Sequence, residues 1–191
     1  MKKSLLIITV AVASFAFSSC KKESVNAQQP KEENTITPSL VIGPGNEECP
    51  ATEVSLLAGQ TINSGSVTVT NDADYIYVTY TTANGWLLTQ THLFVGNCAL
   101  IPVNNAGNPI PGQFPYSTAH NNATSYTYRI PISSIGSGNC GCIASHAVVV
   151  KLNASGQVIN QQTGWGNGVR INPNGGNWGM KFNYCTCIIA P

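Results

Sequence analysis

The sequence predicts one all-β domain over residues 49–191, built as an antiparallel β-sandwich, with a closed β-barrel as the alternative. Charged residues nearly vanish after Cys49, and Asn, Thr, Ser, Gly and Tyr take their place. That composition suits strands joined by tight turns. Several short segments alternate between apolar and polar residues, which is the period of a strand with one buried face. Turn sequences such as Asn84-Gly85 separate these segments.

Seven segments are expected as strands. The run Ile143–Leu152 is apolar at nearly every position, which predicts a central strand buried on both faces. Pro131 places the end of Tyr126–Ile130 at a sheet edge or a strand terminus. Turns are expected at 71–74, at Asn84-Gly85 and at 153–156. The expected strands are Ser66–Thr70, Tyr75–Thr82, Trp86–Val95, Tyr126–Ile130, Ile143–Leu152, Val158–Ile159 and Met180–Ile189.

The first 19 residues have the pattern of a lipoprotein signal peptide. Lys2 and Lys3 are followed by an apolar stretch, Leu5–Phe17, that is too short to span a bilayer comfortably. The tetrapeptide Phe17-Ser18-Ser19-Cys20 resembles the end of the signal in bacterial lipoproteins. This resemblance implies that Cys20 is acylated and becomes the first residue of the mature, membrane-anchored protein. An ordinary signal peptide with an incidental cysteine is the alternative.

Residues 20–48 are expected to be a flexible tether. Lys, Glu, Gln, Asn and Pro dominate this stretch, and it shows no apolar periodicity. Its start, Cys20-Lys21-Lys22-Glu23-Ser24, resembles that of Bacteroidota lipoproteins, which implies display on the outer face of the outer membrane. Only one acidic residue follows the lysines, so a periplasm-facing position stays open as the alternative.

The charge of the chain excludes several partners. Loss of Lys2 and Lys3 with the signal changes the formal net charge from +1 to −1, and only 9% of all residues are charged. A nearly neutral chain has no electrostatic footprint for nucleic acid or for anionic polymers. No nucleic-acid partner and no cofactor is therefore expected, and contact with the membrane is assigned to the anchor at Cys20.

The cysteines predict three disulfides. Six remain besides Cys20, and two pairs of them, Cys140/Cys142 and Cys185/Cys187, have one residue between them. Alternate residues of a strand face the same side, which favours bonds to neighbouring segments over a ring within each pair. Zinc held by the four thiols is the rival, although zinc sites prefer wider spacing. The disulfide candidates are Cys49, Cys98, Cys140, Cys142, Cys185 and Cys187.

Catalytic constellations are sparse in this sequence. The three histidines His92, His120 and His146 lie in different segments without a metal-ligand spacing, and His146 is expected to be buried and hydrogen-bonded. Asp72 and Asp74 suit turn capping or a weak calcium site. With Glu53 they are the only carboxylates after Cys49, and no serine stands in a Gly-x-Ser-x-Gly motif. A catalytic site and a bound metal are therefore not expected.

Aromatic residues in glycine- and asparagine-rich loops are the best binding candidates. Trp165 and Trp178 stand among residues too small to bury them, and Tyr116 ends a third loop of this kind. An exposed tryptophan or tyrosine offers a rigid apolar platform to a sugar ring or to a protein loop. The alternative is that the two tryptophans plug the open ends of the sandwich. Trp86, next to a hairpin turn, is expected in the core.

Four segments together resemble a group of secreted bacterial surface domains without an established activity. The likeness spans about residues 54–184 and implies an exported surface module, but it brings no catalytic residues. The segments are Thr91–Gly96, Gly107–Tyr116, Ile143–Val149 and Gly164–Gly168.

The sequence thus favours a surface lipoprotein whose β-domain binds carbohydrate or a protein partner without catalysis, through Trp165, Trp178 and Tyr116. A structural envelope component without a dedicated ligand is one alternative. A metal-dependent hydrolase that uses the three histidines is another.

Overall fold

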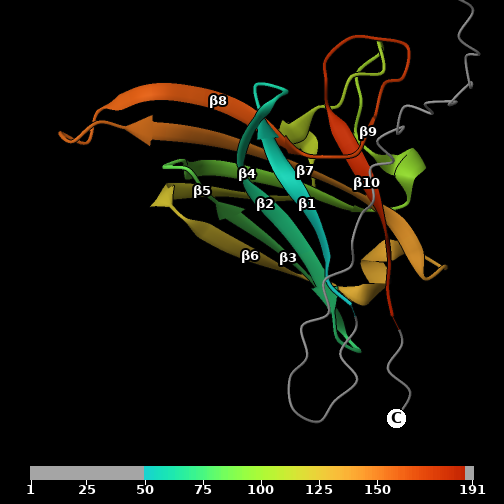
Figure 1. Cartoon of the computed structure of the whole chain (residues 1–191). Helices are drawn as coiled ribbons and strands as arrows, with labels where there is room; N and C mark the ends of the chain where they lie inside the picture. Colours follow the sequence, from blue (N-terminus) through green and yellow to red (C-terminus); the bar gives the residue numbers. More distant parts are fainter. Residues whose placement is uncertain (1–49, 188–191) are drawn as a thin grey trace, which may run out of the picture. The chain divides into compact units, whose positions relative to one another are not determined.

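The computed structural model describes residues 50–187 (Figure 1). The predicted signal peptide at 1–19, the lipidation site Cys20, the tether up to residue 48, and Cys49 lie outside the described residues. None of the helices found within 50–187 has the length and apolar character needed to cross a membrane.

The described chain folds into one antiparallel sheet that curls into a nearly closed, barrel-like shape (Figure 1). The expected all-β antiparallel class is confirmed, and the shape is that of the barrel alternative. Neighbouring strands follow the order β5-β4-β7-β8-β1-β2-β3-β6, and β10 pairs with β7 and β9. The strands are β1 Thr52–Ala58, β2 Ile62–Asn71, β3 Tyr75–Thr82, β4 Leu87–Gly96, β5 Tyr116–Ala123, β6 Ser125–Pro131, β7 Cys140–Leu152, β8 Val158–Gly166, β9 Val169–Arg170 and β10 Met180–Cys185.

Local sequence patterns explain most of these elements. β3 has the bounds expected for it, and the Asn84-Gly85 turn that follows has positive φ angles of 56° and 75°, as a tight hairpin turn requires. β7 is the predicted central strand, because β4, β8 and β10 all pair with it. Three short 3-10 helices complete the described fold: η1 Cys98–Leu100, η2 Pro111–Gln113 and η3 Ile132–Ile135.

Three strands, β1, β5 and the two-residue β9, were not expected. β1 contains Leu56 next to Leu57, which hides the alternation that the burial of its residues follows. β5 has the sequence YSTAHNNA, which is too polar to signal a strand, and it is held by its ladder with β4. The strand β8 also reaches further than expected, because it continues through Trp165 to Gly166.

The inner core fills the barrel with alternate residues of nearly every long strand. Tyr80 and Leu93 are fully buried there, and Trp86 is 3% exposed, which confirms its expected place. The hydroxyl of Tyr80 donates a hydrogen bond to the carbonyl of His92 at 3.1 Å. Strand alternation puts the neighbours His92 and Phe94 on the opposite, outer face of β4.

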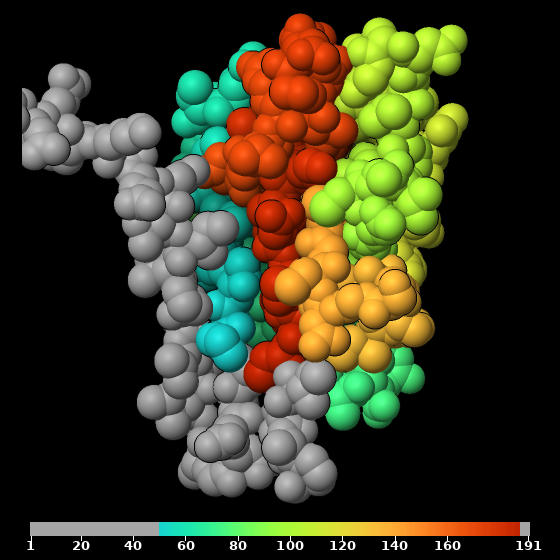
Figure 2. Space-filling view, turned by 90° about the vertical axis from the view of Figure 1, so that its right-hand side faces the viewer, coloured from blue at the N-terminus to red at the C-terminus, as the bar shows by residue number. Residues whose placement is uncertain are grey.

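A second core lies on that outer face, under two long loops. It consists of Phe94, Ile101, Phe114, Cys142, Ala144 and Trp165. Figure 2 shows the covering loops side by side, one before β5 in yellow-green and one before β10 in orange-red. Asn108 joins them, because its Oδ1 accepts from the backbone N–H of Asn177 at 2.9 Å and from Nδ2 of Asn172 at 3.3 Å.

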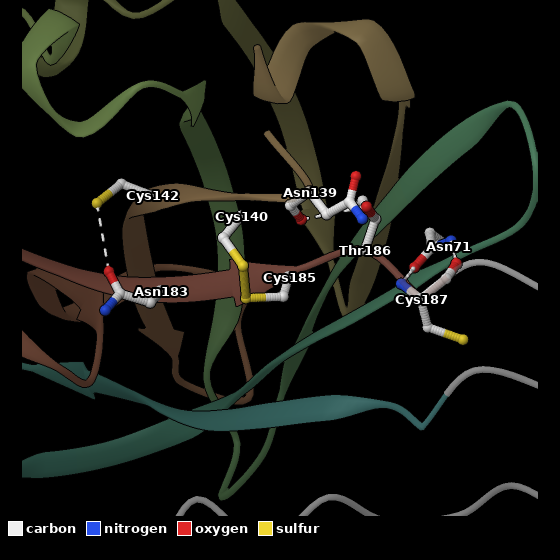
Figure 3. The surroundings of a disulfide bond; sticks show 8 residues. All are labelled: Asn71, Asn139, Cys140, Cys142, Asn183, Cys185, Thr186 and Cys187. Carbon is white, nitrogen blue, oxygen red and sulfur yellow. Dashed lines mark hydrogen bonds between the residues drawn. A yellow bond between two sulfur atoms is a disulfide. The ribbon is translucent and has the colours of Figure 1, made fainter. Parts of the chain in front are cut away.

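Disulfides hold β7 on two sides. Cys140 bonds to Cys185, which is its register partner on β10 (Figure 3), and Cys142 bonds to Cys98 of η1. Cys187 is disulfide-bonded as well. The prediction of bonds between segments, rather than within each Cys-x-Cys pair, is therefore confirmed for Cys140 and Cys142. The zinc rival is wrong, because these four cysteines are disulfide-bonded and leave no free thiolates for the metal.

Candidate functional site

The three aromatic residues predicted to bind a ligand lie on two different faces of the sheet. Trp165 is 4% exposed and belongs to the second core. Trp178 is half-buried and packs against that same core from the covering loop. Tyr116 begins β5 and packs against the inner core instead. The fold therefore brings the two tryptophans together and keeps Tyr116 apart from them.

Tyr116 lies where the two ends of the strand order meet, which we call the seam. β5 and β6 are the terminal strands of that order, and Thr124 alone connects them. Within residues 50–187, no backbone ladder joins β5 to β6. Side chains bridge the two strands instead. The seam residues are Thr91, Tyr116, Thr118, His120, Tyr126 and Tyr128.

Hydroxyl groups form a connected network along the seam. Thr91 Oγ1 lies 2.8 Å from the hydroxyl of Tyr128 and 2.8 Å from Nε2 of His120. Thr118 Oγ1 donates to the hydroxyl of Tyr126 at 3.3 Å and accepts from that of Tyr128 at 3.2 Å. These bonds fix the side chains of β4, β5 and β6 relative to one another without any backbone pairing across the seam.

The aromatic rings of the seam pack against one another. The ring centroid of Tyr126 lies 4.8 Å from that of Tyr128 and 4.7 Å from that of His120. The ring of Tyr116 is 6.3 Å from that of Tyr128. Tyr128 is 7% exposed, whereas Tyr116, His120 and Tyr126 are half-buried. The seam therefore has a buried floor and an accessible aromatic rim.

The seam is electrically neutral at physiological pH. Burial lowers the pKa of His120 below its ordinary value of 6.5, so its imidazole is uncharged at pH 7. Burial also raises the pKa of the Tyr128 hydroxyl, which keeps its proton. The six residues include no carboxylate, lysine or arginine. The seam therefore offers uncharged hydroxyl groups and ring faces.

A second polar feature is a buried pair of histidines on the outer face of the sheet. His92 and His146 are register partners on β4 and β7, and their Nδ1 atoms are 3.2 Å apart. They are 8% and 7% exposed, so the expected burial and hydrogen bonding of His146 are confirmed. Burial and, to a smaller extent, the charge that His92 would carry lower the pKa of His146 from 6.5 to about 3. One neutral Nδ1–H donates to the other Nδ1.

We expect acid to destabilise the fold through His146. The unfolded histidine binds a proton near pH 6.5, whereas the folded one stays neutral down to about pH 3. The unfolded state binds more protons than the folded state in this window. The contribution of His146 to the free energy of unfolding is therefore fully present above pH 6.5 and decreases as the pH falls below it. The loss at pH 5 is about 2 kcal/mol relative to pH 7.5.

Urea denaturation of the protein and of the His146→Gln variant at both pH values measures this effect. The variant should lose clearly less stability between pH 7.5 and pH 5 than the original protein. Asp72 does not interfere, because its folded pKa is lowered below 3.8 and its contribution is lost only at more acidic pH. Equal losses in both proteins would show that His146 does not carry the acid sensitivity.

The three histidines do not converge. His120 contacts Thr91 at the seam, whereas His92 and His146 lie on the outer face. Among the residues that the structure describes, no three side chains of His, Cys, Asp or Glu are grouped so as to hold a metal ion.

The carboxylates serve a turn and a strand pair. Asp72 accepts hydrogen bonds from the backbone N–H groups of Asp74 and Tyr75 at 2.8 and 2.7 Å, and from the hydroxyl of Tyr77 at 2.6 Å. The expected turn capping is therefore confirmed for Asp72, and these three bonds lower its pKa. Glu53 accepts from Thr68 on the neighbouring strand.

The sequence alone did not predict most of the seam residues. Tyr126 and Tyr128 alternate in a predicted strand, but nothing local shows that they face β5. Their contacts with Thr118 and His120 depend on how far the sheet curls, which is a property of the whole fold. The polar sequence of β5 was the one available signal, because an edge strand tolerates such residues.

No family model, no curated protein and no solved structure matches this chain. The resemblance to secreted surface domains therefore stays a prediction.

Proposed function

We propose that this protein is a non-catalytic carbohydrate-binding module at the bacterial cell surface, and that it binds sugar at the seam between β5 and β6. The observation that carries the proposal is the half-buried aromatic rim of the seam above a network of hydroxyl groups. Aromatic rings stack against the apolar faces of sugars, and neutral hydroxyl groups pair with sugar hydroxyls. A protein ligand is an alternative outcome of the test below.

The electrostatics of the seam support a neutral ligand. An uncharged His120 and a protonated Tyr128 offer donors and acceptors without attracting ions. Much of the network is also fixed before binding, because Thr91, Thr118 and Tyr128 already hold one another. Preorganised groups lose less entropy when a ligand binds. A polar, uncharged and preorganised surface fits a carbohydrate better than it fits an acidic or basic partner.

The disulfides are typical of an oxidising compartment outside the cytoplasm. We further propose that the acyl chains on Cys20 anchor the protein in the outer membrane, with the β-domain facing the exterior. Two or three chains make such an anchor stable. Mass spectrometry of the N-terminal peptide from cell membranes tests the anchor, and an unmodified Cys20 would refute it.

The test is binding of the purified full-length protein to an array of glycans, followed by titration of the best glycan. Replacing Tyr126 by alanine should weaken binding by about tenfold, equivalent to about 1.4 kcal/mol, because one of the three half-buried rings of the rim is lost. The Tyr126→Phe variant keeps the ring and removes only the hydroxyl that accepts from Thr118, so it should lose less affinity.

Tyr75→Ala is the matched control. Tyr75 is also a half-buried tyrosine in a strand, but its ring packs under Arg129, 3.3 Å from the guanidinium carbon, on the outer face of the barrel. Its removal should leave glycan affinity unchanged. Equal losses in the Tyr126→Ala and Tyr75→Ala variants, or binding that only Trp178→Ala abolishes, would refute the seam as the site.

A structural role in the envelope is the second candidate. This role is favoured by the two disulfides within the described domain and by the burial of Trp165. These features stabilise the fold and do not contact a ligand. Failure to bind any glycan or extracellular protein would support this candidate.

A further inference from the structure

Strand β8 extends beyond the neighbour that covers its outer edge. Its last three residues, Gly164–Gly166, pair with β1, and one more bond joins the N–H of Gly59 to the carbonyl of Thr163 at 3.0 Å. Among residues 50–187, the first five residues of β8, 158–162, pair only with β7. Figure 1 shows this half of the β7–β8 hairpin projecting past the end of β1. We call residues 158–162 the open edge.

The backbone of Gln161 faces away from β7. The N–H and C=O groups of a strand residue point to the same side, and this side alternates along the strand. Because the carbonyl of Thr163 points to β1, the groups of Gln161 point the same way, past the end of β1. Those of Gln162 point to its register partner Val149. Gln161 therefore presents one donor and one acceptor at the open edge.

The open edge carries neither the charges nor the prolines that commonly protect an edge strand, and its one bulge lies at Ile159. Its sequence, VINQQ, contains no charged residue and no proline, and its first two residues, Val158 and Ile159, are 55% and 64% exposed. Natural edges carry charges, prolines or bulges that prevent pairing with another chain. The outer strand β6, by comparison, contains Arg129 and Pro131. The register shift opposite Lys151 and Leu152 is the one irregularity in β8, and it lies before Gln161.

We propose that the open edge of β8 pairs with the open edge of a second copy of this chain, as an antiparallel two-fold dimer. A two-fold axis beside Gln161 lets each Gln161 N–H donate to the carbonyl of the other. Such an interface uses the same patch on both copies. The uncharged edge does not repel itself, and the formal net charge of only +1 for the whole chain gives little long-range repulsion between copies.

The dimer joins two sheets into one through few contacts, so it is weak. Interfaces well below about 1,200 Å² belong to transient complexes. We expect the low affinity of a transient contact, which confinement on a surface would strengthen. The proposal does not depend on carbohydrate binding, because the open edge and the seam share no residue.

Sedimentation of the full-length protein in density-matched detergent micelles tests the dimer. Ile159→Lys places a charge on the open edge and should weaken dimerisation at least about tenfold, since a charged side chain on an edge strand opposes its pairing with another chain. Val169→Lys is the matched control, because Val169 is also 64% exposed but lies on β9. This control should dimerise like the original protein.

Gln161→Pro separates pairing from folding. Proline removes the N–H that faces the second copy, and it is tolerated at edges where that group is not bonded within the sheet. We expect a monomeric variant with an unchanged circular dichroism spectrum. Gln162→Pro should instead disrupt the hairpin, because its N–H faces β7. A protein that stays monomeric at about 1 mM, where even a dimer with a dissociation constant of about 1 mM would be half formed, would overturn the proposal. Equal weakening by Ile159→Lys and Val169→Lys would overturn it as well.

Discussion

Replacing Trp165 by alanine is expected to lower the free energy of unfolding by about 3–5 kcal/mol, the range for a buried tryptophan. Trp165 is 4% exposed and contacts rings on two sides, with centroids 6.2 Å from Phe114 and 4.9 Å from His146. Its removal leaves a cavity under the two covering loops, which the disulfide of Cys142 keeps from collapsing. Urea denaturation monitored by circular dichroism measures the loss.

Trp178→Ala is the control for this prediction. Trp178 packs against the same core but is only half-buried, so its removal should lower the free energy of unfolding by about 1–2 kcal/mol. If both variants lose the same small amount, Trp165 is not a structural centre of the second core. The result also decides how binding data are interpreted, because a Trp165→Ala variant that fails to bind a ligand has first to be shown to fold.

The local sequence was enough to predict the strands with a clear pattern. β3 alternates throughout, and a strong turn follows it, so both its limits were predictable. The apolar run of β7 showed that the strand is covered on both faces. These features depend on residues within about ten positions of one another, where periodicity and turn chemistry act.

Features that depend on distant pairing were not predictable. One row of register partners crosses four adjacent strands and consists of Ser117, His92, His146 and Trp165. Residues that are neighbours in this row lie up to 54 positions apart in the sequence. No local pattern places Trp165 beside His146, so a tryptophan between glycines looked exposed. The seam is a similar case, since it exists only because β5 and β6 end the sheet on both sides.

Asn71 shows the same limit at the far end of the barrel. It was predicted only as part of a turn, but it is 7% exposed and bridges β2 to the C-terminal strand. Its Oδ1 accepts from the hydroxyl of Tyr184 at 2.8 Å. Its Nδ2 donates to the carbonyl of Cys187 at 2.9 Å, and Figure 3 shows Asn71 beside Cys187. These partners lie more than 110 positions away in the sequence.

Removing either described disulfide is expected to destabilise the domain strongly. Cys140–Cys185 and Cys98–Cys142 close loops of nearly equal length, with sequence separations of 45 and 44. Loop-closure entropy alone predicts a loss of about 4 kcal/mol for each bond. Replacing both cysteines of a bond by alanine avoids an unpaired thiol, and the loss is measured by urea denaturation of each double variant.

Comparison of the two double variants separates chain entropy from packing. Because the loops match in length, the entropic losses cancel in the difference between the variants. The remaining difference reports burial: Cys142 is fully buried in the second core, whereas Cys140 and Cys185 are exposed. The Cys98→Ala/Cys142→Ala variant should therefore be less stable than the Cys140→Ala/Cys185→Ala variant by about 1 kcal/mol, the value of the lost apolar contacts. The opposite order would mean that the link between β7 and β10 stabilises more than the second core does, and that the covering loops hold their place without Cys98.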